Sequence, residues 1–302
     1  MRPIAENIAD IGMDTISLSG TLPMKLRAIR DAGFSQVMLM ARDLTAHAEG
    51  AAAAVDAVRA SGLRVTGFQV LRDFEGLSGN LHEYKIDIAK SMLEMCAALG
   101  SKVLLVCSST SVHATEDRDI LARDLRKLAM LALPLGINVA YEGLSWGRHI
   151  NEFTQAWDVV CRADAPNLGL GIDSFHIFAT KTSLEELDAL DPEKIFLVQL
   201  ADFMWQEIRS VEERITTART FRVFPGEGVH SALLAEIVTR LDRLGYTGDY
   251  SFEVFNDDYQ QMTPAMVAER GYRAAQWLGE DVLKRSTPLP GQMRLRGLRK
   301  SA

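Results

Sequence analysis

The chain contains 302 residues, of which 47% are hydrophobic and 24% are charged, and its formal net charge is −7. This balance is typical of a soluble globular protein and excludes a mainly disordered chain, and the negative charge argues against a nucleic-acid binder. No apolar stretch approaches the roughly 20 residues that a membrane span needs, so we predict no membrane association. Residues 1–14 lack the pattern of a secretory signal, and the three scattered cysteines, Cys96, Cys107 and Cys161, favour reduced, buried thiols. Together these features predict a cytoplasmic protein.

Short β-branched and aliphatic runs alternate with helical patterns along the chain. We predict strands near residues 14–18, 35–40, 64–69, 102–107, 137–142, 168–173, 195–200 and 249–254. Between the strands, one helix begins at Thr21 and closes at Gly33, two long amphipathic helices fit residues 81–99 and 117–135, and the last begins at Thr263. Eight strands that alternate with helices can form either a closed barrel or an open, doubly wound sheet.

The absence of a G-x-G-x-x-G motif after the first strand weakens the dinucleotide-binding form of the open sheet. We therefore predict an α/β fold, the (β/α)8 TIM barrel. Residues 1–283 form its single catalytic domain, because no linker rich in Pro, Gly or Ser interrupts the alternation. Residues 284–302 carry six Lys or Arg side chains among Pro and Gly residues. This segment is expected to be a flexible basic tail, either simply solvated or serving as an interaction arm.

Four of the later strands end on a residue that can bind a hard metal ion: Glu142, Asp173, Gln199 and Glu253. In a barrel of parallel strands, the C-terminal strand ends meet on the face that carries active sites. Three carboxylates and an amide oxygen there would form an oxygen-rich site for Mg²⁺, Mn²⁺ or a similar divalent ion, whose charge would offset the cost of burying the acids. Alternatively, these residues are loop residues or helix caps, and Gln199 is a core amide.

Two histidines follow these strand ends closely in the sequence. His176 comes three residues after Asp173, and His149 comes seven residues after Glu142. Because a histidine titrates near neutral pH, it can move a proton in either direction, and we predict both as acid–base candidates. The alternative for each is a loop histidine that bonds a backbone carbonyl.

Three arginines also follow strands or precede the last one, at Arg72, Arg148 and Arg222. Guanidinium groups at a barrel mouth would suit an anionic substrate, because they can make paired hydrogen bonds to a carboxylate or a phosphate. The alternative is that each forms a salt bridge with a neighbouring acid. Trp146 and Phe175 could form walls of the same pocket, although aromatic residues are more often part of a core.

Several segments, taken together, resemble the xylose-isomerase-like barrels, a superfamily of sugar-phosphate isomerases and epimerases. The likeness spans about residues 14–278 and is strongest to bacterial 3-dehydroshikimate dehydratases of the quinate-degradation type. It is carried by Ser17–Leu22, Arg72–Gly76, Trp146–His149 with Asn151, Asp173–His176, Val198–Asp202, Phe224–Gly226 and Glu253–Asp258.

This resemblance implies a metal-dependent hydro-lyase that converts 3-dehydroshikimate to protocatechuate and water. The metal ion would stabilise the enolate that forms when the carbon beside the ketone loses its proton. In the family, Mn²⁺, Mg²⁺ or Co²⁺ would be held by the residues that match Glu142, Asp173, Gln199 and Glu253.

The same resemblance places Arg72, Arg222 and His176 against the substrate. The base that removes the proton would be His176 or His149. A metal-bound carboxylate acts as the base in related epimerases, so Glu253 is a further catalytic candidate.

The chain departs from the dehydratase pattern at two places. An acidic run of the form Glu-x-x-Glu-Asn-Asp-Leu would be expected where this chain has Met38–Leu44. Ser and His would be expected before Arg222, where Ala218 and Thr220 stand. Met and Ala in place of carboxylates make that side of the pocket more apolar, so the substrate could differ while the metal chemistry is kept.

Two other functions therefore stay open: an isomerase or epimerase of a keto-sugar or its phosphate, and a non-catalytic binding protein built on the same barrel. Epimerases of this fold tend to carry a carboxylate six residues after the fifth strand's Glu, where this chain has Arg148, and this favours the lyase. The expected partner is a small anionic molecule, and a homo-oligomer is a further expectation.

Overall fold

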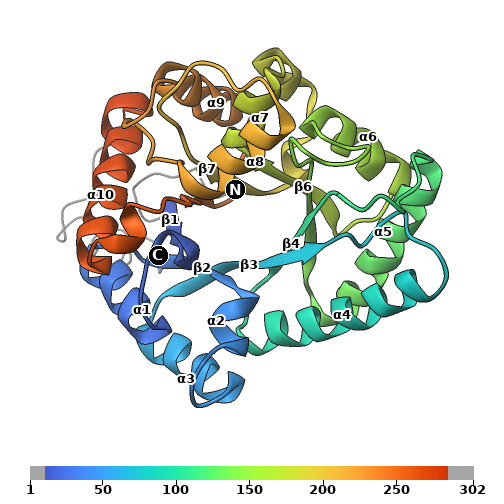
Figure 1. Ribbon diagram of the computed structural model, residues 1–302, viewed down its shortest axis with the longest axis horizontal. Coiled ribbons are helices and arrows are strands. Elements are labelled where there is room, and N and C mark those ends of the chain that lie inside the picture. The colour runs from blue at the N-terminus through green and yellow to red at the C-terminus, as the bar shows by residue number, and fades with distance from the viewer. Residues whose placement is uncertain (1–10, 285–302) are drawn as a thin grey trace, which may run out of the picture.

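A computed structural model describes residues 11–284, in which eight parallel strands form a closed barrel inside a ring of helices (Figure 1). Each strand pairs with its neighbours in chain order, and β8 closes the barrel against β1. The predicted (β/α)8 barrel is therefore confirmed. Of the predicted basic tail, only Lys284 lies within the described residues.

The strands are β1 (Ile11–Asp14), β2 (Gln36–Met40), β3 (Arg64–Arg72), β4 (Val103–Cys107), β5 (Asn138–Glu142), β6 (Leu168–Asp173), β7 (Ile195–Leu200) and β8 (Tyr250–Phe252). The α-helices are α1 (Leu22–Asp31), α2 (Ala41–Thr45), α3 (Ala51–Ser61), α4 (Gly79–Ala98), α5 (Arg118–Ala132), α6 (Phe153–Ala163), α7 (Ser174–Thr180), α8 (Val211–Thr220), α9 (Ser231–Leu244) and α10 (Pro264–Gln276). Within residues 11–284, no helix combines the length and the apolar character that crossing a membrane requires.

The first strand lies earlier in the chain than predicted. The predicted strand at 14–18 begins at Asp14, whereas β1 ends there, and Thr15–Ser17 form a 3-10 turn. In that turn the Ser17 hydroxyl donates to the carbonyl of Phe252 at 3.3 Å, and such side-chain bonds compete with regular strand pairing. The correction moves Asp14 from the start of a strand to its C-terminal end. The other seven strands overlap their predicted ranges.

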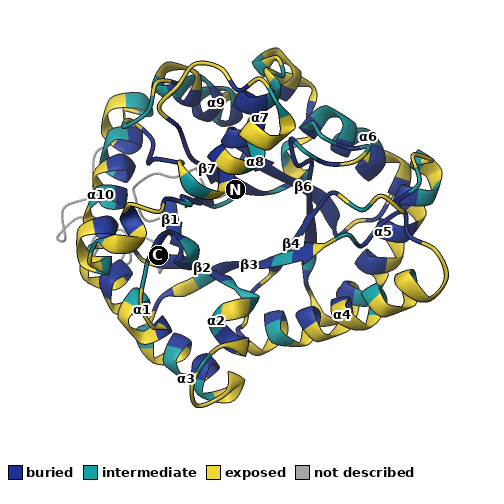
Figure 2. Cartoon of the chain, in the orientation of Figure 1, coloured by how far each residue is buried: buried dark blue, intermediate teal, exposed yellow. Residues whose placement is uncertain are grey.

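Side chains along each strand alternate between the barrel interior and the helix layer, as the period of a β-strand requires. In β4, Leu105 and Cys107 pack inside the barrel, whereas Leu104 and Val106 join the larger core between barrel and helices. Figure 2 shows the consequence: the strands and the inner helix faces are buried, and the outer helix faces are exposed.

The same alternation directs the predicted metal ligands inward. Glu142 lies two residues after Ala140 in β5, and Gln199 lies two residues after Leu197 in β7; both Ala140 and Leu197 belong to the interior cluster. In β6 the corresponding position before Asp173 is a glycine, Gly171. A Cβ at Gly171 would lie 2.8 Å from Leu105 Cδ1, so a larger residue there would require the Leu105 side chain to shift.

All three cysteines carry free thiols, in line with the predicted reduced state. Cys96 and Cys107 are buried, but Cys161 is exposed. The prediction of three buried thiols is thus wrong for Cys161, because that residue lies on a solvent-facing part of α6 next to the exposed Arg162.

Candidate metal centre and active site

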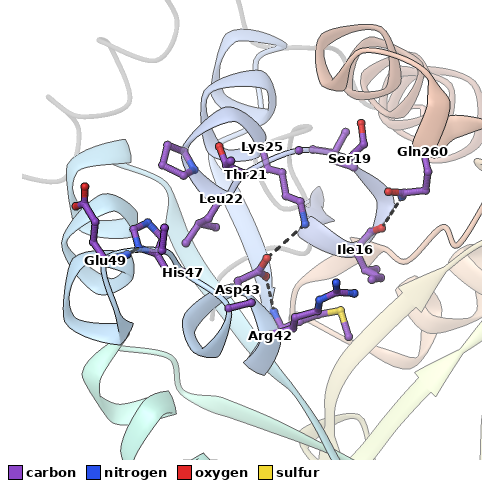
Figure 3. A pocket seen from close by; sticks show the side chains of 16 residues that line it. Ile16, Ser19, Thr21, Leu22, Lys25, Arg42, Asp43, His47, Glu49 and Gln260 are labelled. Carbon is purple, nitrogen blue, oxygen red and sulfur yellow. Dashed lines mark hydrogen bonds and ion pairs between the residues drawn. The ribbon is translucent and has the colours of Figure 1, made fainter.

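A cavity of about 650 Å³ lies beside the segments that follow β1 and β2 (Figure 3). Its wall carries an ion pair between Lys25 Nζ and Asp43 Oδ1 at 3.4 Å, and Asp43 Oδ2 accepts the Met40 backbone N–H at 2.9 Å. Asp43 is thus engaged by neighbouring groups. Met40 also borders a second cavity, where the chemically distinctive residues lie.

This second cavity, of about 200 Å³, opens among the C-terminal ends of the strands and is the candidate active site. The side chains that line it come from strands far apart in the sequence. They include Gln69 from β3, Cys107 from β4, Glu142 from β5 and Glu253 just after β8. A cavity at this end of a (β/α)8 barrel is the expected position of an active site.

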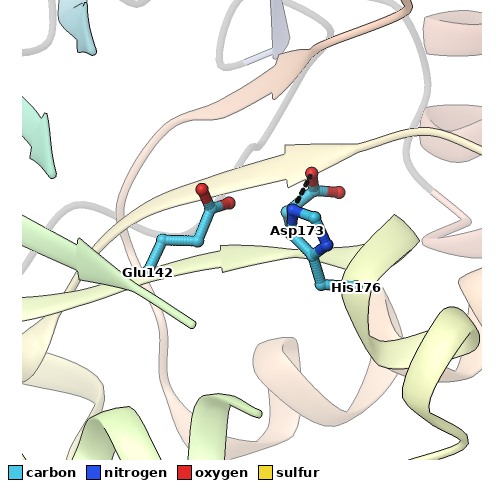
Figure 4. Close-up of side chains that lie close together, drawn as sticks. All are labelled: Glu142, Asp173 and His176. Atoms are coloured by element: carbon cyan, nitrogen blue, oxygen red, sulfur yellow. Dashed lines mark ion pairs between the residues drawn. The ribbon is translucent and has the colours of Figure 1, made fainter. Parts of the chain in front are cut away.

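Glu142, Asp173 and His176 form a buried cluster at this cavity. One potential ligand atom from each residue lies within 4.8 Å of those of the other two (Figure 4). Among the described residues, this is the one group of three or more His, Cys, Asp or Glu side chains that is close enough to hold a metal ion. Asp173 ends β6 and caps α7, because its Oδ1 accepts the Phe175 N–H at 2.8 Å. The first turn of α7 then brings His176 Nε2 to 3.6 Å from Asp173 Oδ2. The alternative role of helix cap therefore applies to one oxygen of Asp173, while the other faces the cluster.

Glu142 has one carboxylate oxygen without a hydrogen-bond partner. Its Oε2 accepts a hydrogen bond from Cys107 Sγ at 2.9 Å, whereas its buried Oε1 has none in the described structure. Burial raises the pKa of Glu142 well above its usual value, and the nearby charges of Asp173 and Glu253 raise it further. A divalent cation would supply the missing partner and reverse this unfavourable charge balance. The donor set thus fits a metal ion that prefers oxygen ligands.

Arg222 is the counter-ion of two of the predicted ligands. Its Nη1 donates to Asp173 Oδ2 at 2.7 Å and to Glu253 Oε2 at 3.0 Å, and its guanidinium carbon lies 4.5 Å from the ring centroid of Phe175. Burial raises the pKa of Glu253, and the charge of Arg222 opposes that rise. Phe175 was predicted as a pocket wall, but it packs against Arg222 and His176, is fully buried and does not line the cavity.

His176 is neutral at pH 7, because burial lowers its pKa to about 4. The backbone N–H of Ser145 donates to His176 Nδ1 at 3.2 Å. The Ser145 hydroxyl lies 3.0 Å from the same nitrogen. Since an amide N–H can only donate, its contact favours Nδ1 as an acceptor and places the single proton of the neutral ring on Nε2. His176 therefore presents an N–H donor toward the acid cluster.

Gln199 reaches a carboxylate that the sequence analysis missed. Gln199 Nε2 donates to Asp14 Oδ2 at 2.9 Å, and Asp14 is fully buried. Burial raises the pKa of Asp14 well above its usual value, with a further contribution from the charge of Glu253. Residues 11–14 form an apolar run that ends on an acid, the same signal that identified the other strand ends, and it was overlooked because the first strand was placed too late.

Two more predicted residues line the cavity. Trp146 packs edge-on against His176 with ring centroids 5.1 Å apart, and the side chain of Arg72, at the end of β3, is exposed at the mouth. Arg219, an exposed side chain of α8 that the sequence analysis did not single out, also borders the cavity. Two guanidinium groups therefore stand at the entrance.

Arg148 and His149 lie away from this cavity and do not line it. In the β5–α6 loop the Arg148 N–H donates to the carbonyl of Ser109 at 2.8 Å, and the Arg148 side chain is exposed. His149 Nε2 lies 3.0 Å from the carbonyl of Ala114. The structure thus places His149 in the alternative role of a loop histidine bonded to a backbone carbonyl, and it does not bring either residue to the site.

Comparison with known proteins gives a consistent pattern. The family profile described as xylose isomerase-like TIM barrel matches residues 26–280. A 3-dehydroshikimate dehydratase of Pseudomonas aeruginosa is 39% identical over 278 residues, which cover 91% of this chain and 43% of that protein. An inosose isomerase of Bacillus licheniformis is 31% identical over 186 residues, which cover 60% of this chain and 64% of that protein.

Among solved structures, a xylose isomerase-like TIM barrel/4-hydroxyphenylpyruvate dioxygenase fusion protein matches with a TM-score of 0.84 and 34% identity. The match covers 94% of this chain and 45% of the fusion protein. The chain therefore spans less than half the length of both the dehydratase and the fusion protein that it resembles.

Proposed function

This chain belongs to the xylose isomerase-like TIM-barrel family, and we propose that it is a metal-dependent hydro-lyase that converts 3-dehydroshikimate to protocatechuate and water. The observation that carries the proposal is the buried acid cluster at the barrel mouth, in which Glu142 Oε1 has no partner. The 39% identity to a protein named 3-dehydroshikimate dehydratase, over 91% of this chain, supports the choice of substrate.

The metal ion in this proposal is Mn²⁺, Mg²⁺ or Co²⁺. Glu142, Asp173 and Glu253 would supply carboxylate oxygens, and Gln199 would supply its amide oxygen, a donor set that these ions prefer. When bound, such an ion supplies Lewis-acid polarisation of the substrate ketone.

The remaining chemistry is the movement of two protons. The Nε2–H of His176 is placed to donate a hydrogen bond to a departing hydroxyl group, because the ring is neutral and its other nitrogen accepts from Ser145. The carboxylate of Glu253 borders the same cavity and is the candidate base for the proton on the carbon beside the ketone. That proton returns to the departing hydroxyl to form water, and a second ring proton moves to the ketone oxygen as the ring becomes aromatic, so the reaction balances without an oxidant or a reductant.

The first prediction concerns the reaction itself. Metal-stripped protein given Mn²⁺, Mg²⁺ or Co²⁺ should generate the ultraviolet absorbance of protocatechuate from 3-dehydroshikimate, and a chelator should abolish it. Failure to form protocatechuate with any of the three ions would defeat the proposal.

The second prediction concerns recognition of the substrate carboxylate. Replacing Arg72 by Leu should raise KM about tenfold or more with a smaller change in kcat, because a charge-assisted hydrogen bond is worth about 1.5–3 kcal/mol. Arg148→Leu is the matched control, since its exposed side chain lies away from the cavity, and its KM should stay close to the original. Equal effects of the two substitutions would rule out a specific role for Arg72.

An isomerase or epimerase of a keto-sugar is the second candidate, favoured by the 31% identity to the protein named inosose isomerase. It would use the same removal of a proton beside a ketone, without loss of water. In D₂O, such an enzyme should introduce deuterium beside the ketone across a panel of keto-sugars and inososes. Deuterium exchange beside the ketone of one of these compounds would favour the isomerase or epimerase over the lyase, provided that the protein forms no protocatechuate from 3-dehydroshikimate.

A further inference from the structure

Asp14 forms the centre of a buried hydrogen-bond network beside the acid cluster. Its Oδ2 accepts from Gln69 Nε2 at 3.0 Å and from Gln199 Nε2 at 2.9 Å, while its Oδ1 accepts from the Ser251 hydroxyl. The side chains of all four residues are buried. A carboxylate in such a place needs these donors, and each donor is in turn fixed by it.

The network determines which way the amide of Gln199 faces. Gln199 Nε2 donates to Asp14 Oδ2 and also lies 3.5 Å from Gln69 Oε1, so both of its N–H groups have acceptors. The amide oxygen of Gln199 is thereby left free to face a cation. If the amide were turned by 180°, its N–H groups would face the cation, and its oxygen would face the Asp14 oxygen. Asp14 disfavours that orientation, because Oδ2 is an acceptor in this network.

The same oxygen of Asp14 holds Gln69, which also forms a side-chain hydrogen bond with Glu253. Asp14 therefore contacts one predicted ligand directly and a second one through Gln69. The residue paired with Asp14 in the neighbouring strand is Met38, whose sulfur lies 3.9 Å from Gln199 Nε2 and is only a weak acceptor. No other described carboxylate accepts from the Gln199 amide, so its orientation depends on Asp14 and on Gln69, which is itself bonded to Asp14.

We infer that Asp14 is a positioning residue that fixes the amide oxygen of Gln199 toward the metal position and thereby sets the affinity of the site for a divalent ion. The inference rests on the proposed function only in assuming that a divalent ion binds there. Hydrogen-bond partners of metal ligands commonly change metal affinity by about 10–100-fold when they are removed.

The test is titration calorimetry of the metal-stripped full chain with Mn²⁺. Asp14→Ala should weaken Mn²⁺ binding by about 10–100-fold, whereas Asp14→Asn should retain most of the affinity, because its amide oxygen can still accept from Gln199. If the alanine variant does not fold, Asp14→Leu replaces it in the test, because leucine fills more of the vacated space. The same loss of Mn²⁺ affinity is expected for Asp14→Leu. Circular dichroism of each metal-free variant checks that the barrel is intact.

A double-mutant cycle separates this role from a general structural one. In the background of Gln199→Ala, Asp14→Ala should cause a much smaller additional loss of Mn²⁺ affinity, because the amide that Asp14 orients is gone. Additive losses, or an unchanged affinity in folded Asp14→Ala, would overturn the inference while the proposed function stands. Absence of Mn²⁺, Mg²⁺ and Co²⁺ binding by the unmodified chain would instead overturn both.

Discussion

Replacing Glu142 by Gln should remove metal binding and reduce kcat/KM for 3-dehydroshikimate by about a thousandfold or more. The substitution keeps the size of the side chain but removes the charge that the cluster offers to a cation. Burial and the charges of Asp173 and Glu253 already oppose ionisation of Glu142, so a bound cation is what makes its negative charge favourable. The measurements are metal content after dialysis and steady-state kinetics.

Glu75→Gln is a matched control for this prediction. Glu75 is also buried, burial raises its pKa to about 7, and its Oε2, like Glu142 Oε1, has no hydrogen-bond partner in the described structure. Its Oε1, however, accepts from the Ser109 N–H at 2.6 Å and from the Tyr141 hydroxyl at 2.9 Å. It does not line the candidate active-site cavity. The control should therefore keep its metal. If Glu142→Gln bound metal as well as Glu75→Gln does, the proposed centre would be misplaced.

The barrel and most of the inward-facing residues could be predicted because they follow from periodicity. An apolar strand that ends on Glu142 or Asp173 places that side chain inside the barrel mouth by alternation alone, and the closed sheet brings successive strand ends together. No long-range information is needed for that step. Asp14 obeys the same rule and was missed because Thr15–Ser17 have the composition of a strand but form a turn with its own side-chain bonds.

The loop residues could not be placed in this way. His176 follows its strand by three residues and His149 follows its strand by seven. Only His176 reaches the cavity, because a short helix begins directly after Asp173 and sets its direction. His149 lies in an irregular loop whose path depends on a backbone bond to Ser109. Arg222 is separated from its acids by long stretches of sequence, so its pairing with Asp173 and Glu253 is a property of the tertiary structure.

That pairing leads to the second large expected effect. Replacing Arg222 by Met should lower the free energy of unfolding of the metal-free protein by about 3–5 kcal/mol, because removal of one partner leaves buried charges uncompensated. The carboxylates of Asp173, Glu253 and Glu142 would then repel one another, because the guanidinium that balances their charge would be absent. Urea denaturation followed by circular dichroism measures the change. Arg219→Met, an exposed neighbour at the same cavity, is the control and should shift stability by no more than about 0.5 kcal/mol.

Addition of metal provides a second, independent readout for this variant. A divalent ion would neutralise the same acids that Arg222 neutralises, so Mn²⁺ should stabilise Arg222→Met by more than it stabilises the unmodified chain. The difference separates loss of a counter-ion from loss of packing against Phe175, which metal could not restore. If Mn²⁺ stabilised both proteins equally, the cost of the substitution would come from packing, and Arg222 and the metal ion would not share these carboxylates.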